Sequence, residues 1–145
     1  MNIRDKILAY LYQKIEASIE EISNSIKEER DEVEVIVNRL KAEGLVIKKQ
    51  KGLIRKKEVI ALTPSGLEEA KKVFEKLEMK AKRIEEMIVK NGNDISALPA
   101  EVLEILPLLA ALSLIDLALL QSIITIAELD LDNEVTDANV DGGDF

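Results

Sequence analysis

A chain of 145 residues is long enough to bury a hydrophobic core without a metal ion or a disulfide. It contains no Cys and no His, which removes the usual zinc ligands, thiol nucleophiles and imidazole bases, so we expect neither an enzyme nor a resident metal or cofactor. The net charge is −8, yet all twenty Lys and Arg lie at or before Lys90, where they face seventeen acids, while eleven acids and no base follow. This asymmetry predicts two parts with different tasks.

The beginning of the chain predicts a cytoplasmic protein with a structural first helix. The residues Met-Asn-Ile-Arg-Asp-Lys carry charge where a secretion signal needs an apolar segment. Abundant Lys, Glu and Ile without Cys is a composition typical of proteins from thermophiles. Residues 3–15 then place five apolar side chains on one helical face: Ile3, Ile7, Leu8, Leu11 and Ile15.

A capping box predicts the start of a second helix. Ser18 can accept a hydrogen bond from the Glu21 amide, while the Glu21 carboxylate reaches back to the Ser18 amide. Ile19, Ile22 and Ile26 follow on one face, and the four charges of residues 27–30 interrupt this stripe. The helix is therefore short.

A third helix is expected to begin with Asp31 as its N-cap. Its apolar stripe consists of Val33, Ile36, Val37 and Leu40. Gly44 then follows, a residue suited to the left-handed conformation that ends helices. The second and third helices therefore meet at a tight turn.

Beyond this glycine, residues 45–62 predict a β-hairpin with Gly52 near its tip. Six cations and no acid lie within ten residues of the hairpin: Lys48, Lys49, Lys51, Arg55, Lys56 and Lys57. If four to six of them contact phosphates, the logarithm of the affinity falls with the logarithm of the salt concentration at a slope of about −4 to −5. The alternative is a lysine-rich edge that only protects the sheet from aggregation.

Thr63 as N-cap and Pro64 as first helical residue predict a long helix. Seven apolar residues form a heptad seam along it: Leu67, Ala70, Phe74, Leu77, Ala81, Ile84 and Ile88. Such a narrow seam requires a partner, which is either the seam of a second subunit in a coiled-coil dimer or another helix of the same chain. We predict the dimer contact, with the helix ending at Asn91-Gly92-Asn93.

Residues 94–129 form an apolar segment dominated by Leu and Ile. Pro99 is expected to be the first residue of a helix, and Pro107 to start or kink a second helical segment. Ser113 and Asp116 repeat the capping-box spacing, which predicts a further helix start. We expect short apolar helices packed against another surface.

A membrane anchor over residues 105–127 is the alternative for this segment. Its two uncharged runs, 105–115 and 117–127, are each short of the roughly 20 residues that a helix needs to cross a bilayer, and Asp116 divides them. Packed helices are therefore the preferred interpretation.

Residues 130–145 carry six acids and no periodicity, which predicts a disordered acidic tail. Asp130, Asp132 and Glu134 resemble the start of a calcium loop, but its glycine and final Glu are missing, so we expect no metal site. The acids and the terminal Phe145 resemble the tails of single-strand DNA-binding proteins, which suggests a protein partner for the tail.

The order of helix, turn, helix ending in LKAEGLV, basic hairpin and ALTPSGLEEA resembles the winged helix-turn-helix regulators of the MarR, PadR and ArsR type. The resemblance covers residues 3 to about 90. It implies a mainly α (α+β) fold: a winged helix-turn-helix with a long C-terminal dimerisation helix and an extra apolar helical segment. The domains would be residues 1–63 for the winged helix, 64–90 for the long helix, 91–129 for the apolar segment and 130–145 for the tail.

The resemblance further implies a homodimeric transcriptional regulator bound to double-stranded DNA, with helix 31–43 in the major groove and the hairpin as a wing. Besides the six hairpin cations, the implied DNA contacts are Arg30, Asn38, Arg39 and Lys41. Five carboxylates at the start of this helix depart from the family pattern: Glu28, Glu29, Asp31, Glu32 and Glu34. Two alternatives therefore stay open, a protein-interaction module or nucleic-acid mimic that inhibits a polymerase-like machine, and a membrane-tethered regulator.

Overall fold

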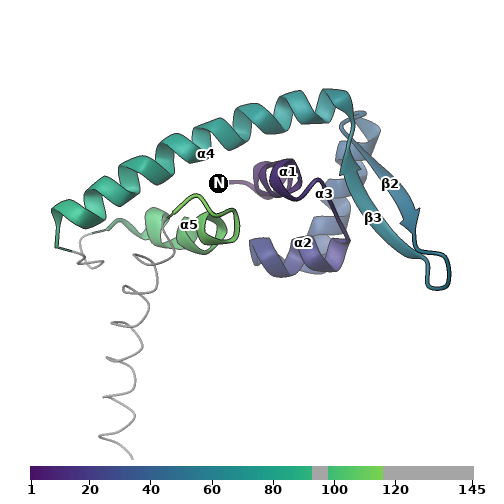
Figure 1. The fold of residues 1–145 in the computed structure, drawn as a ribbon, viewed down its shortest axis with the longest axis horizontal. Helices are drawn as coiled ribbons and strands as arrows, with labels where there is room; N and C mark the ends of the chain where they lie inside the picture. The colour runs from purple at the N-terminus through teal and green to yellow at the C-terminus, as the bar shows by residue number, and fades with distance from the viewer. Residues whose placement is uncertain (93–97, 116–145) are drawn as a thin grey trace, which may run out of the picture.

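The computed structural model describes residues 1–92 and 98–115 (Figure 1). Within these ranges the elements are α1 (Ile3–Lys14), β1 (Glu16–Ala17), α2 (Ile19–Ile26), α3 (Arg30–Ala42), β2 (Val46–Lys51), β3 (Lys57–Leu62), α4 (Pro64–Lys90) and α5 (Ala100–Ala111). Together they form the mainly helical winged helix-turn-helix that the sequence predicts, with a small antiparallel sheet. The hairpin projects at the end where α4 begins, and α5 lies near the end where α4 finishes (Figure 1).

The helix-turn-helix consists of α2 and α3, which pack on each other and on α1. The predicted stripes of both helices face the core, where Ile22, Val33, Val37 and Leu40 are completely buried. The cap of α2 is also confirmed, because the Ser18 hydroxyl oxygen accepts the Glu21 amide at 3.2 Å. Apolar spacing and one capping side chain thus account for this part of the fold.

Two predicted helix boundaries are wrong. Ile15 does not extend the buried face of α1; it has a φ of 74° and its side chain is 74% exposed, because the chain turns there to enter β1. Asp31 is not the N-cap of α3. Glu29 takes the extended cap conformation, and Asp31 lies in the first turn, where the positive end of the helix dipole favours a carboxylate.

The two motifs that carried the family resemblance contact each other directly. Gly44 has a φ of 77° and ends α3 in a Schellman motif, with the Leu45 amide bonded to the Leu40 carbonyl at 2.9 Å. Thr63 accepts the Gly66 amide as the cap of α4 and donates its hydroxyl to the Gly44 carbonyl at 2.6 Å. A Cβ on Gly66 would lie 1.8 Å from the Leu45 carbonyl oxygen, so only glycine fits this contact.

The three strands pair in the order β1-β3-β2, all antiparallel. In the wing, β2 and β3 pair from Val46 opposite Leu62 to Lys51 opposite Lys57. Gly52 begins the connection with a φ of 109°, as expected for a glycine near the tip. The base of the hairpin is buried on the helices, whereas its outer half lies in solvent.

The heptad seam of α4 faces α1 and α5 of the same chain. Five of its seven side chains are buried there: Ala70, Leu77, Ala81, Ile84 and Ile88. Phe74 is half-buried and packs on Tyr12 with ring centroids 5.0 Å apart, and Leu67 is half exposed. The partner of the buried seam is therefore the other helices of the same chain, which was the second of the two alternatives left open by the sequence.

Helix α5 is a single helix rather than two segments divided at Pro107. Pro99 is its N-cap rather than its first residue, and Pro107 lies inside it with its ring exposed. Ser113 has a φ of 57° and lies at the end of α5, where the Leu114 amide bonds to the Leu109 carbonyl at 2.9 Å. The buried side of α5 belongs to the same hydrophobic core as α1, α2, α3 and α4.

The predicted end of α4 is described at Asn91, its C-cap, and at Gly92, with a φ of 65°. The predictions outside the described residues are the role of Asn93, the cap at Asp116, the apolar run 117–127, the acidic tail 130–145 and the calcium-like spacing within it. In the part of the chain that the structure describes, no helix has both the length and the apolar character needed to span a membrane.

Candidate nucleic-acid interface

The outward side of α3 is the first surface of the candidate site. Residues 31, 35, 38 and 42 lie opposite the buried Val33, Val37 and Leu40, because their spacing of 4, 3 and 4 keeps them on one side of a helix. Asn38 is therefore near the centre of this surface, and the exposed Arg39 lies at its edge. Arg30 and Lys41 are exposed on the opposite flank of the helix.

Val35 was missed by the sequence analysis. It is exposed at the centre of the outward side of α3, beside Asn38. The signal was present in the sequence, because Val35 does not share the period of the stripe formed by Val33, Ile36, Val37 and Leu40. An apolar side chain at such a position can contact the methyl group of thymine.

The carboxylates at the start of α3 do not form one acidic surface. Glu28 turns toward α1, where its carboxylate accepts a hydrogen bond from Lys6 at 2.6 Å and both side chains are largely buried. Glu34 is half-buried on the flank of the helix. Glu29, Asp31 and Glu32 remain exposed, and their side chains form no hydrogen bond or ion pair with a described residue. One of the five predicted carboxylates is therefore paired with a lysine, and three of the other four are exposed.

The six wing cations divide into two groups of three. Lys48, Lys51 and Lys57 form ion pairs with Glu58, Glu16 and Glu21. Lys49, Arg55 and Lys56 are exposed, and none of them forms an ion pair or hydrogen bond with a residue that the structure describes. Arg55 and Lys56 thus lie at the tip of the hairpin, whereas Lys49 lies opposite Val59, nearer the base than Lys51 and Lys57.

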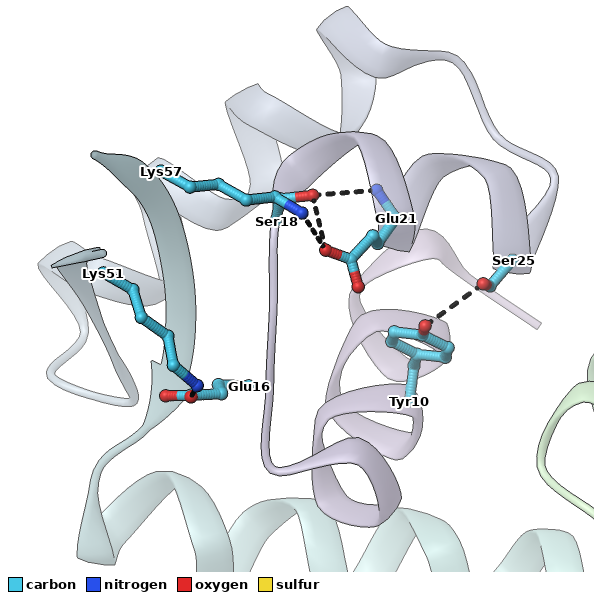
Figure 2. Close-up of polar contacts among 7 residues, drawn as sticks. All are labelled: Tyr10, Glu16, Ser18, Glu21, Ser25, Lys51 and Lys57. Carbon is cyan, nitrogen blue, oxygen red and sulfur yellow. Dashed lines mark hydrogen bonds and ion pairs between the residues drawn. The ribbon is translucent and has the colours of Figure 1, made fainter. Parts of the chain in front are cut away.

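Two of these ion pairs connect the hairpin to the rest of the winged helix. Figure 2 shows Lys51 directed to Glu16 of β1, and Lys57 directed to Glu21 in the first turn of α2, 2.6 Å from its carboxylate. Because Lys51 and Lys57 face each other across the strands, their like charges would repel without these partners. The carboxylates therefore neutralise the last paired position of the strands and leave Arg55 and Lys56 at the tip without ion-pair partners among the described residues.

The pKa values of these groups reflect the same contacts. The hydrogen bond from Lys51 lowers the pKa of Glu16, against partial desolvation, and the charges of Lys51 and Lys49 lower it further. The hydrogen bond from Lys57 likewise lowers the pKa of Glu21, with smaller contributions from Ser18, and raises the pKa of Lys57 itself. Glu16, Glu21 and Lys57 are therefore charged at neutral pH.

The overall fold is found in solved proteins of known class. No protein-family model matches this sequence, and no curated protein matches it. A MarR family transcriptional regulator from Silicibacter pomeroyi DSS-3 has a similar structure, with a TM-score of 0.53, 19% identity, and coverage of 75% of this chain and 76% of that chain. ZitR from Lactococcus lactis, in a mutant apo form, has a TM-score of 0.51, 17% identity, and coverage of 76% and 79%. The chain therefore has the winged-helix fold of MarR-type regulators.

Proposed function

We propose that this protein is a dimeric DNA-binding transcriptional regulator, with α3 in the major groove and the wing on the flanking phosphates or in the minor groove. The observation that carries the proposal is that Arg55 and Lys56 at the tip of the wing, and Lys49 nearer its base, are exposed and form no ion pair with a described residue. Such cations attract phosphates without first breaking an ion pair. The fold supports the same assignment, because winged helices use the wing and the second helix of the helix-turn-helix together.

The outward side of α3 supplies side chains suited to base contacts. The Asn38 amide can pair with adenine and the Arg39 guanidinium with guanine, and Val35 offers an apolar contact for thymine. Arg30 and Lys41, on the other flank, are better placed for phosphates than for bases. Arg30 lies 3.9 Å from Glu20, an exposed pair that is weak enough to exchange for a phosphate contact.

The dimer remains part of the proposal, but its contact needs surfaces beyond the buried seam. Leu67 and Phe74 are the seam residues with exposed surface, and Met79 and Val89 add exposed apolar side chains on α4. A second subunit can therefore reach α4 without displacing α1 or α5. Light scattering of the full chain gives the mass in solution, and a monomer at micromolar concentration would contradict this part of the proposal.

A salt series with duplex DNA tests the main proposal. The probe is a mixed-sequence duplex of about 40 base pairs, and the variant is Lys49→Ala/Arg55→Ala/Lys56→Ala. Removing three phosphate contacts should reduce the steepness of the log–log salt dependence by about 2.7 and lower the affinity at least tenfold at moderate salt. Wild-type protein that fails to shift the duplex even at low salt would reject direct DNA binding.

A charge-matched control separates wing contacts from a general loss of positive charge. Lys71, Lys76 and Lys82 are exposed on α4, outside the hairpin, and their replacement by Ala removes the same number of positive charges. We expect the control to bind with nearly wild-type affinity and slope. An equal loss in both variants would show that the wing has no special role.

A second candidate is a winged helix that contacts a basic protein surface or mimics nucleic acid. The exposed Glu29, Asp31 and Glu32 at the start of α3 favour it. The variant Glu29→Gln/Asp31→Asn/Glu32→Gln distinguishes the two functions. Under the first proposal this variant should bind duplex DNA more tightly, because three repulsive charges are removed. Under the second it should lose its affinity for a basic partner, because the carboxylates that contact that partner are gone.

A further inference from the structure

The tip of the wing carries two large apolar side chains in full contact with solvent. Leu53 is 100% exposed and Ile54 is 97% exposed. Between residues 1 and 92 and from 98 to 115, no other large apolar side chains are exposed to this degree. Neither side chain contributes to the core, so folding does not explain why apolar residues occupy the most protruding positions of the hairpin.

The backbone holds these two residues at the apex. The chain bends at residues 53–55, and Gly52 begins the bend with a φ of 109°. A Cβ on Gly52 would lie 2.3 Å from the Arg55 carbonyl oxygen, so the two ends of the bend approach each other as closely as a glycine permits. This close approach leaves Leu53 and Ile54 as the outermost residues, side by side.

The charges around the apex specify its partner. The next two residues after Ile54 are Arg55 and Lys56, which are exposed and unpaired within the described ranges, and the paired Lys51 and Lys57 follow at the end of the strands. An apolar centre with a cationic rim matches the DNA minor groove, whose sugars and base edges lie between two rows of phosphates. Apolar side chains inserted from this groove open base steps and bend the duplex.

We propose that Leu53 and Ile54 form an apolar wedge that enters the minor groove, partly unstacks a base step and bends the DNA. This inference rests on the proposed function, since it assigns a second task to the same wing. Arg55 and Lys56 bind the phosphates on either side of the wedge and draw the apex into the groove. The wedge favours pyrimidine–purine steps such as TA, because these unstack most easily.

DNA affinity and DNA bending depend on different side chains of the wing, whereas in a purely cationic hairpin both would depend on the cations. Affinity and its salt dependence come from the cations, whereas bending comes from the apolar pair. The test compares wild type, Leu53→Ser/Ile54→Ser and a control, Ile15→Ser/Leu103→Ser, which removes two exposed apolar side chains outside the wing, α3 and α4. All three proteins should have the same melting temperature, because none of the changed side chains is buried.

Each protein is titrated onto a duplex of about 40 base pairs, labelled at both ends for energy transfer and containing 2-aminopurine at a central TA step. Wild type and control should raise the energy transfer and the 2-aminopurine fluorescence at saturation. Leu53→Ser/Ile54→Ser should bind about five- to tenfold more weakly, with an unchanged salt slope, and should leave both signals at the level of free DNA. A duplex with the TA step replaced by AA should give smaller signals with wild type.

Two results overturn the inference in distinguishable ways. If wild type binds the duplex with the expected salt slope but gives neither signal, or if the Ser variant gives both signals, the wedge is rejected while the proposed function stands. If wild type does not bind the duplex at all, both are rejected. In that case, binding to anionic phospholipid vesicles that is lost in Leu53→Ser/Ile54→Ser would identify the apex as a membrane contact instead.

Discussion

The wing and the seam of α4 are the two regions whose sequence patterns predicted contacts with another molecule. They differ in how much of them the folded chain buries. Three wing cations stay exposed and form no ion pair within residues 1–92 and 98–115, whereas five seam residues are buried against α1 and α5 of the same chain. The difference follows from the side chains. A charged terminus on a long stem stays in water because burial removes its hydration, but an apolar seam packs on whichever helix is nearest. A heptad pattern therefore predicts a partner without identifying its chain.

The largest expected effect on stability comes from a substitution in the buried seam of α4. Leu77→Ala removes a completely buried side chain between α4 and the helices beneath it, and should lower the free energy of unfolding by about 2–5 kcal/mol. Urea denaturation at a protein concentration low enough to dissociate dimers measures it. Leu67→Ala, in the same seam but half exposed, is the control and should cost less than about 1 kcal/mol. Equal effects would mean that the seam is not packed within the chain.

An intermediate effect is expected at the junction between α4 and the start of the wing. Gly66→Ala places a methyl group against the Leu45 carbonyl, and overpacking of this kind costs about 1–3 kcal/mol. The exposed neighbour Ser65 provides a control, since Ser65→Ala should change the stability by no more than about 0.5 kcal/mol. Thermal unfolding of both variants measures the difference. An unaffected melting temperature in Gly66→Ala would show that α4 is not held against Leu45.

The smallest expected effect concerns the ion pairs that Lys51 and Lys57 of the wing form with Glu16 and Glu21. The pKa values of Glu16 and Glu21 should lie below 4.5, because Lys51 and Lys57 stabilise the charged carboxylates. The stabilisation by these pairs is therefore fully present at neutral pH and is lost as the pH falls through the lowered pKa values. An NMR titration of the carboxyl carbons measures this directly.

Lysine variants make the titration specific to each pair. Lys51→Ala should return the pKa of Glu16 toward 4.5 without moving that of Glu21, and Lys57→Ala should do the reverse. The stability of both variants should stay close to that of wild type, because the pairs are exposed and solvent weakens them. A shared shift would show that the two carboxylates respond to the total charge of the wing.

The fold could be predicted where local chemistry decides the outcome. The cap at Ser18, the left-handed Gly44 and the Thr63-Pro64 helix start each satisfy backbone groups within a few residues, so their effect can be derived from neighbours in sequence. The order of these signals was sufficient to predict a winged helix. The N-cap of α3 was assigned two residues too late because Glu29 supplies the cap conformation without a side-chain hydrogen bond, which leaves no recognisable signal.

The candidate site was less predictable because its charges depend on tertiary contacts. Glu28 counted as part of an acidic surface until its pairing with Lys6, twenty-two residues away, removed it. The pairing of Lys51 with Glu16 and of Lys57 with Glu21 likewise joins residues distant in sequence. Val35 was overlooked for a different reason. Its spacing excluded it from the buried stripe, but an apolar residue is not expected on the outer surface of a helix, where it lies.

The bonds that Thr63 makes with Gly44 and Leu45 set the orientation of α3 relative to α4 at the base of the hairpin, far from its tip. Insertions or deletions beyond Lys51 therefore leave that angle unchanged. A hairpin of another length or charge could be transplanted onto this scaffold, and the orientation of α3 relative to α4 would stay the same. Among proteins of this architecture, sequence divergence should accordingly be fastest at the tip of the hairpin and slowest at the contact between Thr63, Gly44 and Leu45.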